Sequence, residues 1–311
     1  DVAAVAALVR EPGVRVVTLT GPGGTGKTRL ALEVGRRLAG DATPFAAIVF
    51  VDLTPVDDAA LVMPAIAGAL DAKDAPGRTP AQAVAAQLGE RPALLILDNF
   101  EQVIDAADDL VDLLRSAAGL TLLVTSRTVL RLYGEYEYPV PVLPLPPPGV
   151  ISPVEALTAP AVALFVERSR AANPRFTLTP DNVAAVIQIC ARLDGLPLAI
   201  ELAAARSRLL APAALASQLA SALDLAGQVR HVSERQRTLR GAIDWSYRLL
   251  SAGEQRLFAW LGVFQGSFNA AAAAAIAGNT PLPDEPATPP SPTRLEVIAS
   301  LADKSMIQTA G

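Results

Sequence analysis

The sequence predicts an open α/β sheet of parallel strands in the first part of the chain, followed by a mainly helical second part. Three observations support this prediction. Short apolar runs alternate with helical patterns over residues 1–145, seven prolines lie within 139–153, and helical spacing dominates from about residue 160 onward. Alternation of strands and helices is typical of a parallel sheet that helices cover.

Four apolar runs are the predicted strands. Strands that are buried on both faces of a sheet have continuously apolar sequences instead of alternating ones. The runs are 16–20 (VVTLT), 47–52 (AIVFVD), 93–98 (ALLILD) and 120–125 (LTLLVT). After the first run, Leu30, Val34 and Leu38 recur at helical spacing and Gly40 follows them, which predicts an amphipathic helix that ends there.

Proline and helical spacing organise the rest of the chain. The prolines of 139–153 are incompatible with a helix and favour an extended connector. Helical patterns follow at about 160–225 and 236–277, and a last one spans 295–306. Six prolines within 281–292 predict a loop.

Composition excludes several classes of protein. With 311 residues, of which 51% are hydrophobic, the chain can bury a large core and is not a disordered protein. It contains neither a signal peptide nor a run of about 18–20 apolar residues, so we expect a cytoplasmic protein without a membrane span. Because the chain begins at Asp1 without Met, we expect a fragment of a longer protein.

Reactive side chains are scarce. A single cysteine, Cys190, excludes an internal disulfide, and with a single histidine, His231, it excludes a Cys/His metal site. Catalysis by a Ser-His or Cys-His arrangement would depend on His231 alone, which we do not expect. The net charge of −5 argues against a protein that coats nucleic acid.

Residues 21–28, GPGGTGKT, match the phosphate-binding pattern G-x-x-x-x-G-K-[ST]. The chain has only three lysines, so the pattern is expected by chance on the order of 10⁻³ times per chain. The segment follows a predicted strand and opens a predicted helix. Its glycines would let backbone N–H groups turn toward phosphate oxygens, at the positive end of the helix dipole. A glycine turn without a ligand is the alternative interpretation.

The expected ligands are ATP or ADP with Mg²⁺. Lys27 would reach the β- and γ-phosphates, and the Thr28 hydroxyl would ligate Mg²⁺. Asp98 ends the third apolar run, where a Walker B aspartate would hold the same ion; a helix cap or a solvated turn is the alternative. The predicted nucleotide-binding residues of the loop and helix are Gly21, Gly23, Gly24, Thr25, Gly26, Lys27, Thr28 and Arg29.

The residues after Asp98 bear on hydrolysis. Many hydrolysing proteins place a second acid directly after this aspartate, but here the position holds Asn99, and the nearest acid is Glu101. Asparagine cannot act as a general base, so we expect slow hydrolysis. Arg127 follows the fourth run and could reach a γ-phosphate, or it could be an ordinary exposed arginine. The predicted catalytic set is therefore Lys27, Asp98 and Arg127.

Four segments together resemble the STAND class of NTPases with the NB-ARC arrangement. They are GPGGTGKT, LLILDN (94–99), LLVTSR (122–127) and GLPLA (195–199). The run 237–247, RTLRGAIDWSY, is similar to the bacterial branch of that class, which occurs in large multidomain transcriptional regulators. The resemblance covers essentially the whole chain, with the motifs in the family's order.

The resemblance implies three domains. They are a P-loop nucleotide-binding domain (1–145), a helical domain with a G-x-P motif (146–228) and a winged-helix domain (229–311) that is incomplete at its C-terminal end. In the family the proline of the motif packs near adenine, and Pro197 occupies that position; a simple turn is the alternative. The family's hydrophobic-Gly-Arg segment would precede Asp1, and its histidine motif would follow Gly311.

The implied function is a signal-transduction switch within a larger regulator, closed with ADP and open with ATP. Its partners would be the nucleotide, other domains of the same protein and, in the ATP state, further copies of the chain. An actively hydrolysing AAA-like ATPase and direct DNA binding through the winged helix are the alternatives. Residues 230–256 hold six arginines against three acids, but the spacing of Leu239, Ile243, Tyr247 and Leu250 favours a packing helix over a DNA contact.

Overall fold

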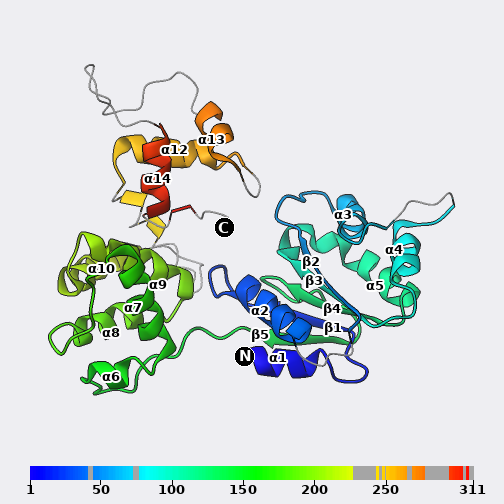
Figure 1. Ribbon diagram of the computed structural model, residues 1–311, viewed down its shortest axis with the longest axis horizontal. Helices are drawn as coiled ribbons and strands as arrows, with labels where there is room; N and C mark the ends of the chain where they lie inside the picture. The colour runs from blue at the N-terminus through cyan, green and yellow to red at the C-terminus, as the bar shows by residue number, and fades with distance from the viewer. Residues whose placement is uncertain are drawn as a thin grey trace. The chain divides into compact units, whose positions relative to one another are not determined.

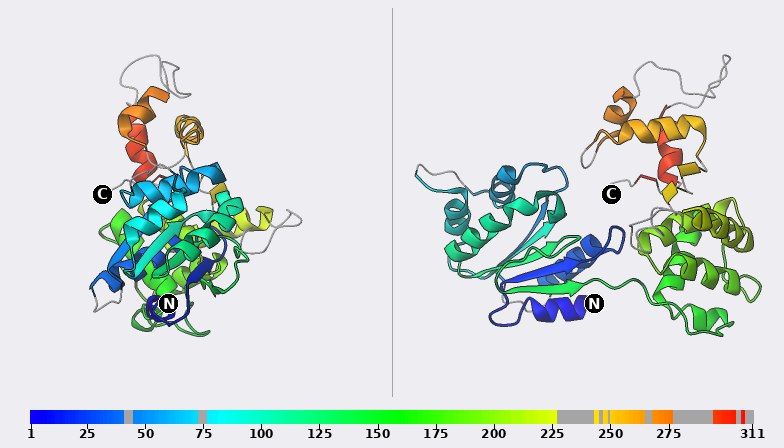
Figure 2. Two further views of the ribbon diagram at one scale, coloured as in Figure 1. Left: turned by 90° about the vertical axis from the view of Figure 1, so that its right-hand side faces the viewer. Right: turned by 180° about the vertical axis from the view of Figure 1, so that it is seen from behind.

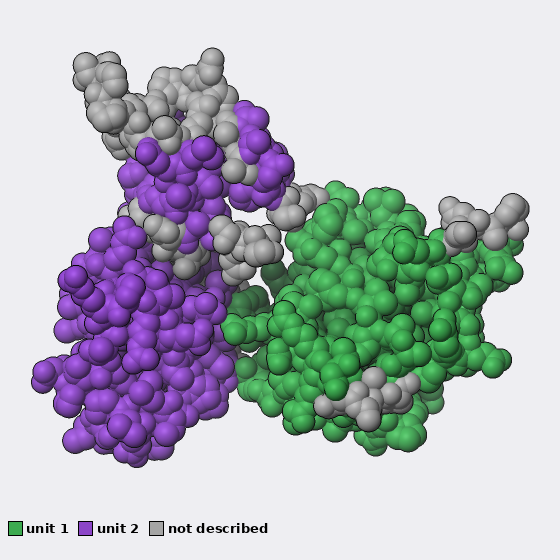
Figure 3. Space-filling view, viewed as in Figure 1, with its two compact units in different colours: residues 1–141 green, residues 142–311 purple. Residues whose placement is uncertain are grey.

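The computed structural model describes residues 1–40, 45–72, 77–226, 243–244, 247–248, 250–264, 268–276, 294–303 and 306–307. The chain divides into two compact units, residues 1–141 and 142–311 (Figure 3). None of the helices in the described part of the chain combines the length and apolar character that a membrane span requires.

The first unit is an α/β sheet with helices on both faces (Figures 1 and 2). Its elements are α1 (Val2–Leu8), β1 (Val16–Thr20), α2 (Lys27–Gly40), β2 (Ala47–Asp52), η1 (Ala59–Leu61), α3 (Val62–Ala69), α4 (Pro80–Leu88), β3 (Ala93–Asp98), η2 (Phe100–Ala106), α5 (Ala107–Ser116), β4 (Leu120–Thr125) and β5 (Glu135–Pro139). All strands are parallel, in the order β2-β3-β4-β1-β5. The four predicted strands are confirmed with their predicted bounds.

The fifth strand, β5, was not predicted from the sequence. It pairs with β1 at the edge of the sheet, and its sequence Glu-Tyr-Glu-Tyr-Pro has no apolar run. An edge strand has one neighbour instead of two, so its side chains remain partly exposed and polar residues are tolerated. Pro139 is accommodated there because an edge strand does not need every backbone N–H for pairing.

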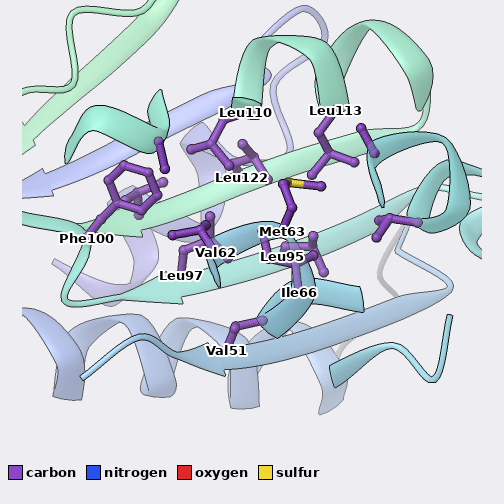
Figure 4. Close-up of a cluster of buried hydrophobic side chains, with 14 of the residues drawn as sticks. Val51, Val62, Met63, Ile66, Leu95, Leu97, Phe100, Leu110, Leu113 and Leu122 are labelled. Atoms are coloured by element: carbon purple, nitrogen blue, oxygen red, sulfur yellow. The ribbon is translucent and has the colours of Figure 1, made fainter. Parts of the chain in front are cut away.

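Alternating residues of the central strands pack on opposite faces of the sheet. Leu94 and Ile96 belong to the cluster with α1 and α2, whereas Leu95 and Leu97 belong to the cluster with α3, α4 and α5 (Figure 4). Burial on both faces explains the continuously apolar sequence of β3. The predicted helix is confirmed as α2, whose residues Leu30, Val34 and Leu38 are buried against the sheet.

The strand order determines where polar residues meet. β4 lies between β1 and β3, and all three strands run in the same direction, so their carboxyl ends lie at one edge of the sheet. The segment 21–26 follows β1, Asp98 ends β3, and Thr125 ends β4. This edge is where open α/β sheets bind their ligands.

The described elements of the second unit are helical. They are α6 (Pro153–Ala156), α7 (Pro160–Ala172), α8 (Val183–Arg192), α9 (Pro197–Ala204), η3 (Ala205–Arg208), α10 (Pro212–Ala226), α12 (Ala252–Leu261), α13 (Ala270–Ile276) and α14 (Arg294–Asp303). One buried cluster joins α6 to α10, and another joins α12, α13 and α14. The predicted boundary at 228–229, His231 and most of the run 237–247 lie outside the described residues, so the division into a helical and a winged-helix domain stays a prediction.

The G-x-P motif forms the turn between α8 and α9. Gly195 has a φ of 65°, and its carbonyl oxygen accepts a hydrogen bond from the Leu143 N–H at 2.9 Å. A Cβ atom on Gly195 would collide with the backbone carbonyl oxygen of Leu143. Pro197 is the first residue of α9, where its missing N–H costs nothing. The glycine therefore permits a close backbone approach, and the proline begins a helix.

Replacing Gly195 should destabilise the second unit. Gly195→Ala combines a steric collision with a left-handed backbone and is expected to lower the free energy of unfolding by about 3 kcal/mol. Gly149→Ala is a matched control, because Gly149 has a φ of 89° but nothing within 4 Å of its Cβ position. The control should lose about 1 kcal/mol. Denaturant unfolding followed by circular dichroism measures both, and equal losses would contradict the importance of the Leu143 contact.

Candidate nucleotide-binding site

The loop between β1 and α2 has a backbone that only glycine adopts readily. Gly21, Gly24 and Gly26 have φ values of 143°, 79° and 90°. Thr25 closes the loop on itself, because its hydroxyl donates to the Pro22 carbonyl oxygen at 3.0 Å. The first N–H groups of α2 have no acceptor within the helix, so this end of the helix presents free donors. A loop and helix end of this kind suit an anion.

Lys27 lies beneath the loop and is 8% exposed. Its ammonium group donates to the carbonyl oxygens of Gly21 at 2.8 Å and Pro22 at 3.1 Å. Burial lowers the pKa of Lys27, while the negative charges of Glu101 and Asp98 raise it and Arg127 lowers it further. A buried cation whose described partners are neutral carbonyls favours an incoming anion. These donors fit the phosphates of a nucleotide.

Asp98, the last residue of β3, is hydrogen-bonded to the first turn of α2 and to the end of β4. The Thr28 hydroxyl donates to Asp98 Oδ1 at 2.8 Å, and the Thr125 hydroxyl donates to the same oxygen at 2.6 Å. Thr125 Oγ1 also accepts from the Asn99 N–H at 2.9 Å. Thr125 thus holds Asp98 in place from the neighbouring strand. No motif of the sequence assigns Thr125 a role, although its position at the tip of a buried strand is a usable signal.

The environment of Asp98 makes the charged form of its carboxyl group unfavourable. Burial raises its pKa, the hydrogen bonds from Thr125 and Thr28 lower it, and the charges of Asp52 and Glu101 raise it. Among the described residues, no group of three or more His, Cys, Asp or Glu side chains could hold a metal. One carboxylate with one hydroxyl nevertheless suits Mg²⁺, which retains waters and takes further oxygens from phosphates. The donor set therefore fits Mg²⁺ together with a nucleotide.

Arg127 and Glu101 complete the group. Asn99 has a left-handed φ of 65°, and the short helix η2 begins directly after it with Glu101 in its first turn. Arg127 Nε donates to Glu101 Oε1 at 2.9 Å. The sequence identifies Glu101 only as the nearest acid after Asp98 and does not predict this ion pair.

The predicted site residues fall into two sets. Those of the loop, α2, β3 and the end of β4 lie together, from Gly21 to Arg29 with Asp98 and Arg127. Within this set the Arg29 side chain is exposed, and its backbone N–H lies in the first turn of α2. Pro197 belongs to the second unit, and its contact with adenine stays a prediction.

This part of the chain is similar to a known protein family. The family model described as the AAA domain matches residues 12–134. The matched segment contains the loop, Asp98, Arg127 and the strands β1 to β4.

Relatives extend over both units. A Mycobacterium tuberculosis protein named "Putative HTH-type transcriptional regulator Rv0890c" is 39% identical over 295 residues, which are 94% of this chain and 31% of the relative. An uncharacterized protein of the same species, Rv0894, is 37% identical over 85% of this chain and 64% of its own length. The chain thus spans about a third of the length of the regulator it matches.

A solved structure shares the fold. It is a Signal Transduction ATPase with Numerous Domains (STAND) protein with a tetratricopeptide repeat sensor from Pyrococcus horikoshii. The likeness covers 99% of this chain and 39% of that protein, with a TM-score of 0.53 and 15% sequence identity. At this identity the likeness concerns the fold alone.

Asp98→Asn should stabilise the ligand-free protein at neutral pH. Both threonine hydroxyls donate to Oδ1, so an amide oxygen keeps both bonds while the buried charge disappears. We expect the midpoint of thermal unfolding to rise by about 2 °C. Asp112→Asn removes a charge from an exposed pair on α5 and should change little.

The pH dependence follows from the direction of the Asp98 shift. The pKa of Asp98 is raised from 3.8, so the folded protein binds this proton more tightly than the unfolded chain does. Ionisation of Asp98 therefore lowers the stability of the folded protein as pH rises from 3.8 through the higher pKa of the folded state. The advantage of Asp98→Asn should be larger at pH 7 than near pH 3.8 and should shrink as pH falls. Thermal melts over this pH range measure it, and a constant advantage would contradict the assignment.

Proposed function

We propose that this chain binds ATP or ADP with Mg²⁺ at the loop 21–28 and acts as a nucleotide-controlled switch within a larger regulator. One observation carries the binding proposal. The buried Lys27 ammonium lies against the loop carbonyls while Thr28 is bonded to Asp98. A cation, a carboxylate bonded to a hydroxyl and the first N–H groups of a helix thus lie at one edge of the sheet, which supports binding of phosphates with Mg²⁺.

Each group has a distinct task in the proposal. The backbone N–H groups from Gly21 to Arg29 surround the phosphates, and Lys27 exchanges its two carbonyl acceptors for phosphate oxygens. Thr28 and Asp98 hold Mg²⁺, with Thr125 keeping the carboxylate in place. The metal, when bound, neutralises charge on the phosphate oxygens. In this proposal, Pro197 packs near the adenine.

Arg127 distinguishes the two nucleotides by its contact with the γ-phosphate. A single hydrogen bond between charged groups is worth about 1.5–3 kcal/mol. Moving a two-state protein from 1:99 to 99:1 takes about 5.5 kcal/mol of differential binding. Arg127 alone is insufficient, so contacts between domains, or a sensor elsewhere in the full protein, supply the rest. ADP holds the closed state, and ATP favours an open state that can associate with further copies.

The relatives support the setting of a larger regulator. The M. tuberculosis protein is named as an HTH-type regulator, and the chain spans 31% of it. We therefore place DNA contact in a separate module, with residues 146–228 and 229–311 coupling the nucleotide to the rest of a cytoplasmic protein. Direct DNA binding by residues 230–311 would appear as salt-sensitive affinity for duplex DNA.

Lys27→Ala tests the binding proposal. We expect affinity for ADP to fall by about 100-fold or more, because the charge that meets the phosphates is lost. The thermal midpoint should not fall, since Lys27 is a buried cation and no part of the apolar core. Arg36→Ala is the control, because Arg36 is an exposed cation of the same helix, paired with Glu33. Calorimetric titration measures affinity, and unchanged ADP binding by Lys27→Ala would refute the proposal.

Turnover separates the switch from the alternative, an actively hydrolysing AAA-like ATPase. The AAA family match keeps that alternative open, but Asn99 occupies the position where a catalytic acid would follow Asp98. We expect steady-state hydrolysis below about 1 s⁻¹, the low end for kinases. A phosphate-release assay on the purified chain measures the rate, and faster turnover would favour the alternative.

A further inference from the structure

The ion pair between Arg127 and Glu101 differs from the surface pairs of the first unit. Arg36–Glu33 and Arg115–Asp112 each join residues three apart on one helix, and all four side chains are at least 54% exposed. Arg127–Glu101 joins residues 26 apart, and the Glu101 side chain is only 15% exposed. A largely buried carboxylate is less screened by water, so its charge acts more strongly on its neighbours.

Only one of the two carboxylate oxygens of Glu101 has a hydrogen-bond partner among the described residues. Its Oε1 accepts from Arg127, but its Oε2 is buried without a hydrogen-bond partner among the described residues. Its negative charge acts on both Lys27 and Asp98, which places it among the groups of the phosphate site. A carboxylate here opposes incoming phosphate and occupies the guanidinium that would attract it.

We propose that Glu101 is the counter-ion of Arg127 in the absence of a γ-phosphate, and that it sets the preference of the site for diphosphate over triphosphate nucleotides. The inference rests on the proposed function, because it requires that phosphates bind at the loop. A γ-phosphate must draw Arg127 away from Glu101, so binding of the triphosphate breaks this ion pair. ADP has no γ-phosphate and leaves the pair intact.

The ratio of the affinity for a triphosphate nucleotide to the affinity for ADP isolates the competition between Glu101 and the γ-phosphate for Arg127. The influence of Glu101 on Lys27 applies largely to both nucleotides and cancels in the ratio. Competition for Arg127 arises with the triphosphate alone. A double-mutant cycle of Glu101 and Arg127 therefore reports whether the two residues act on the preference as a pair.

The experiment titrates the chain with Mg²⁺ and either ADP or a non-hydrolysable ATP analogue. Glu101→Gln should raise affinity for the analogue relative to ADP by about five- to tenfold, and Arg127→Ala should lower that ratio. Adding Glu101→Gln to Arg127→Ala should change the ratio by less than about twofold. Asp112→Asn, which removes a carboxylate from an exposed arginine pair on α5, should leave the ratio unchanged.

Each other outcome overturns the inference. An unchanged ratio means that Glu101 does not compete, and a lower ratio means that it helps to hold the triphosphate. A full increase that persists with Arg127→Ala means simple repulsion without the pair. If the unmodified chain binds neither nucleotide, the proposed function itself fails, which is a distinguishable result. Glu101→Ala removes the same charge and decides the matter if the glutamine variant does not fold.

Discussion

The hydrogen bonds to Asp98 are the interaction on which the site depends. They join three segments that are far apart in sequence: the first turn of α2, the end of β3 and the end of β4. The parallel pairing of β1, β4 and β3 makes this possible, because it brings three strand ends to one edge. The sheet core provides the rigid support, and in the proposed site the buried carboxylate, whose charged form is unfavourable, would supply the affinity for a cation. Stability and ligand binding are therefore in opposition at this residue.

The parts of the fold that the sequence predicts are those in which local pattern and burial agree. β1, β3 and β4 were predicted with their bounds because burial on both faces demands apolar residues throughout. β2 was predicted from a similar apolar run, but it is an edge strand and only partly buried, so the expectation of burial on both faces was wrong for it. β5 was missed because a polar edge strand has no such requirement. The loop was predicted because its glycines and lysine form a fixed local pattern. Helices α12 to α14 fall in or beside predicted helical regions, whereas their domain assignment depended on a resemblance alone.

The site was predicted in its parts and not in its pairings. Lys27, Thr28 and Asp98 were identified from position, and the structure brings them together. The contacts of Thr125 with Asp98 and of Arg127 with Glu101 depend on strand order and on the left-handed turn at Asn99. Neither feature is encoded in a short motif. Sequence patterns identify groups that face a ligand more readily than the partners that position those groups.

The bonds from Lys27 to its own loop have a consequence for nucleotide exchange. In the proposed site, the ammonium group would exchange these two carbonyl acceptors for phosphate oxygens, and the loop would supply the same acceptors again when the phosphates leave. Lys27 would therefore retain hydrogen-bond partners with or without a nucleotide.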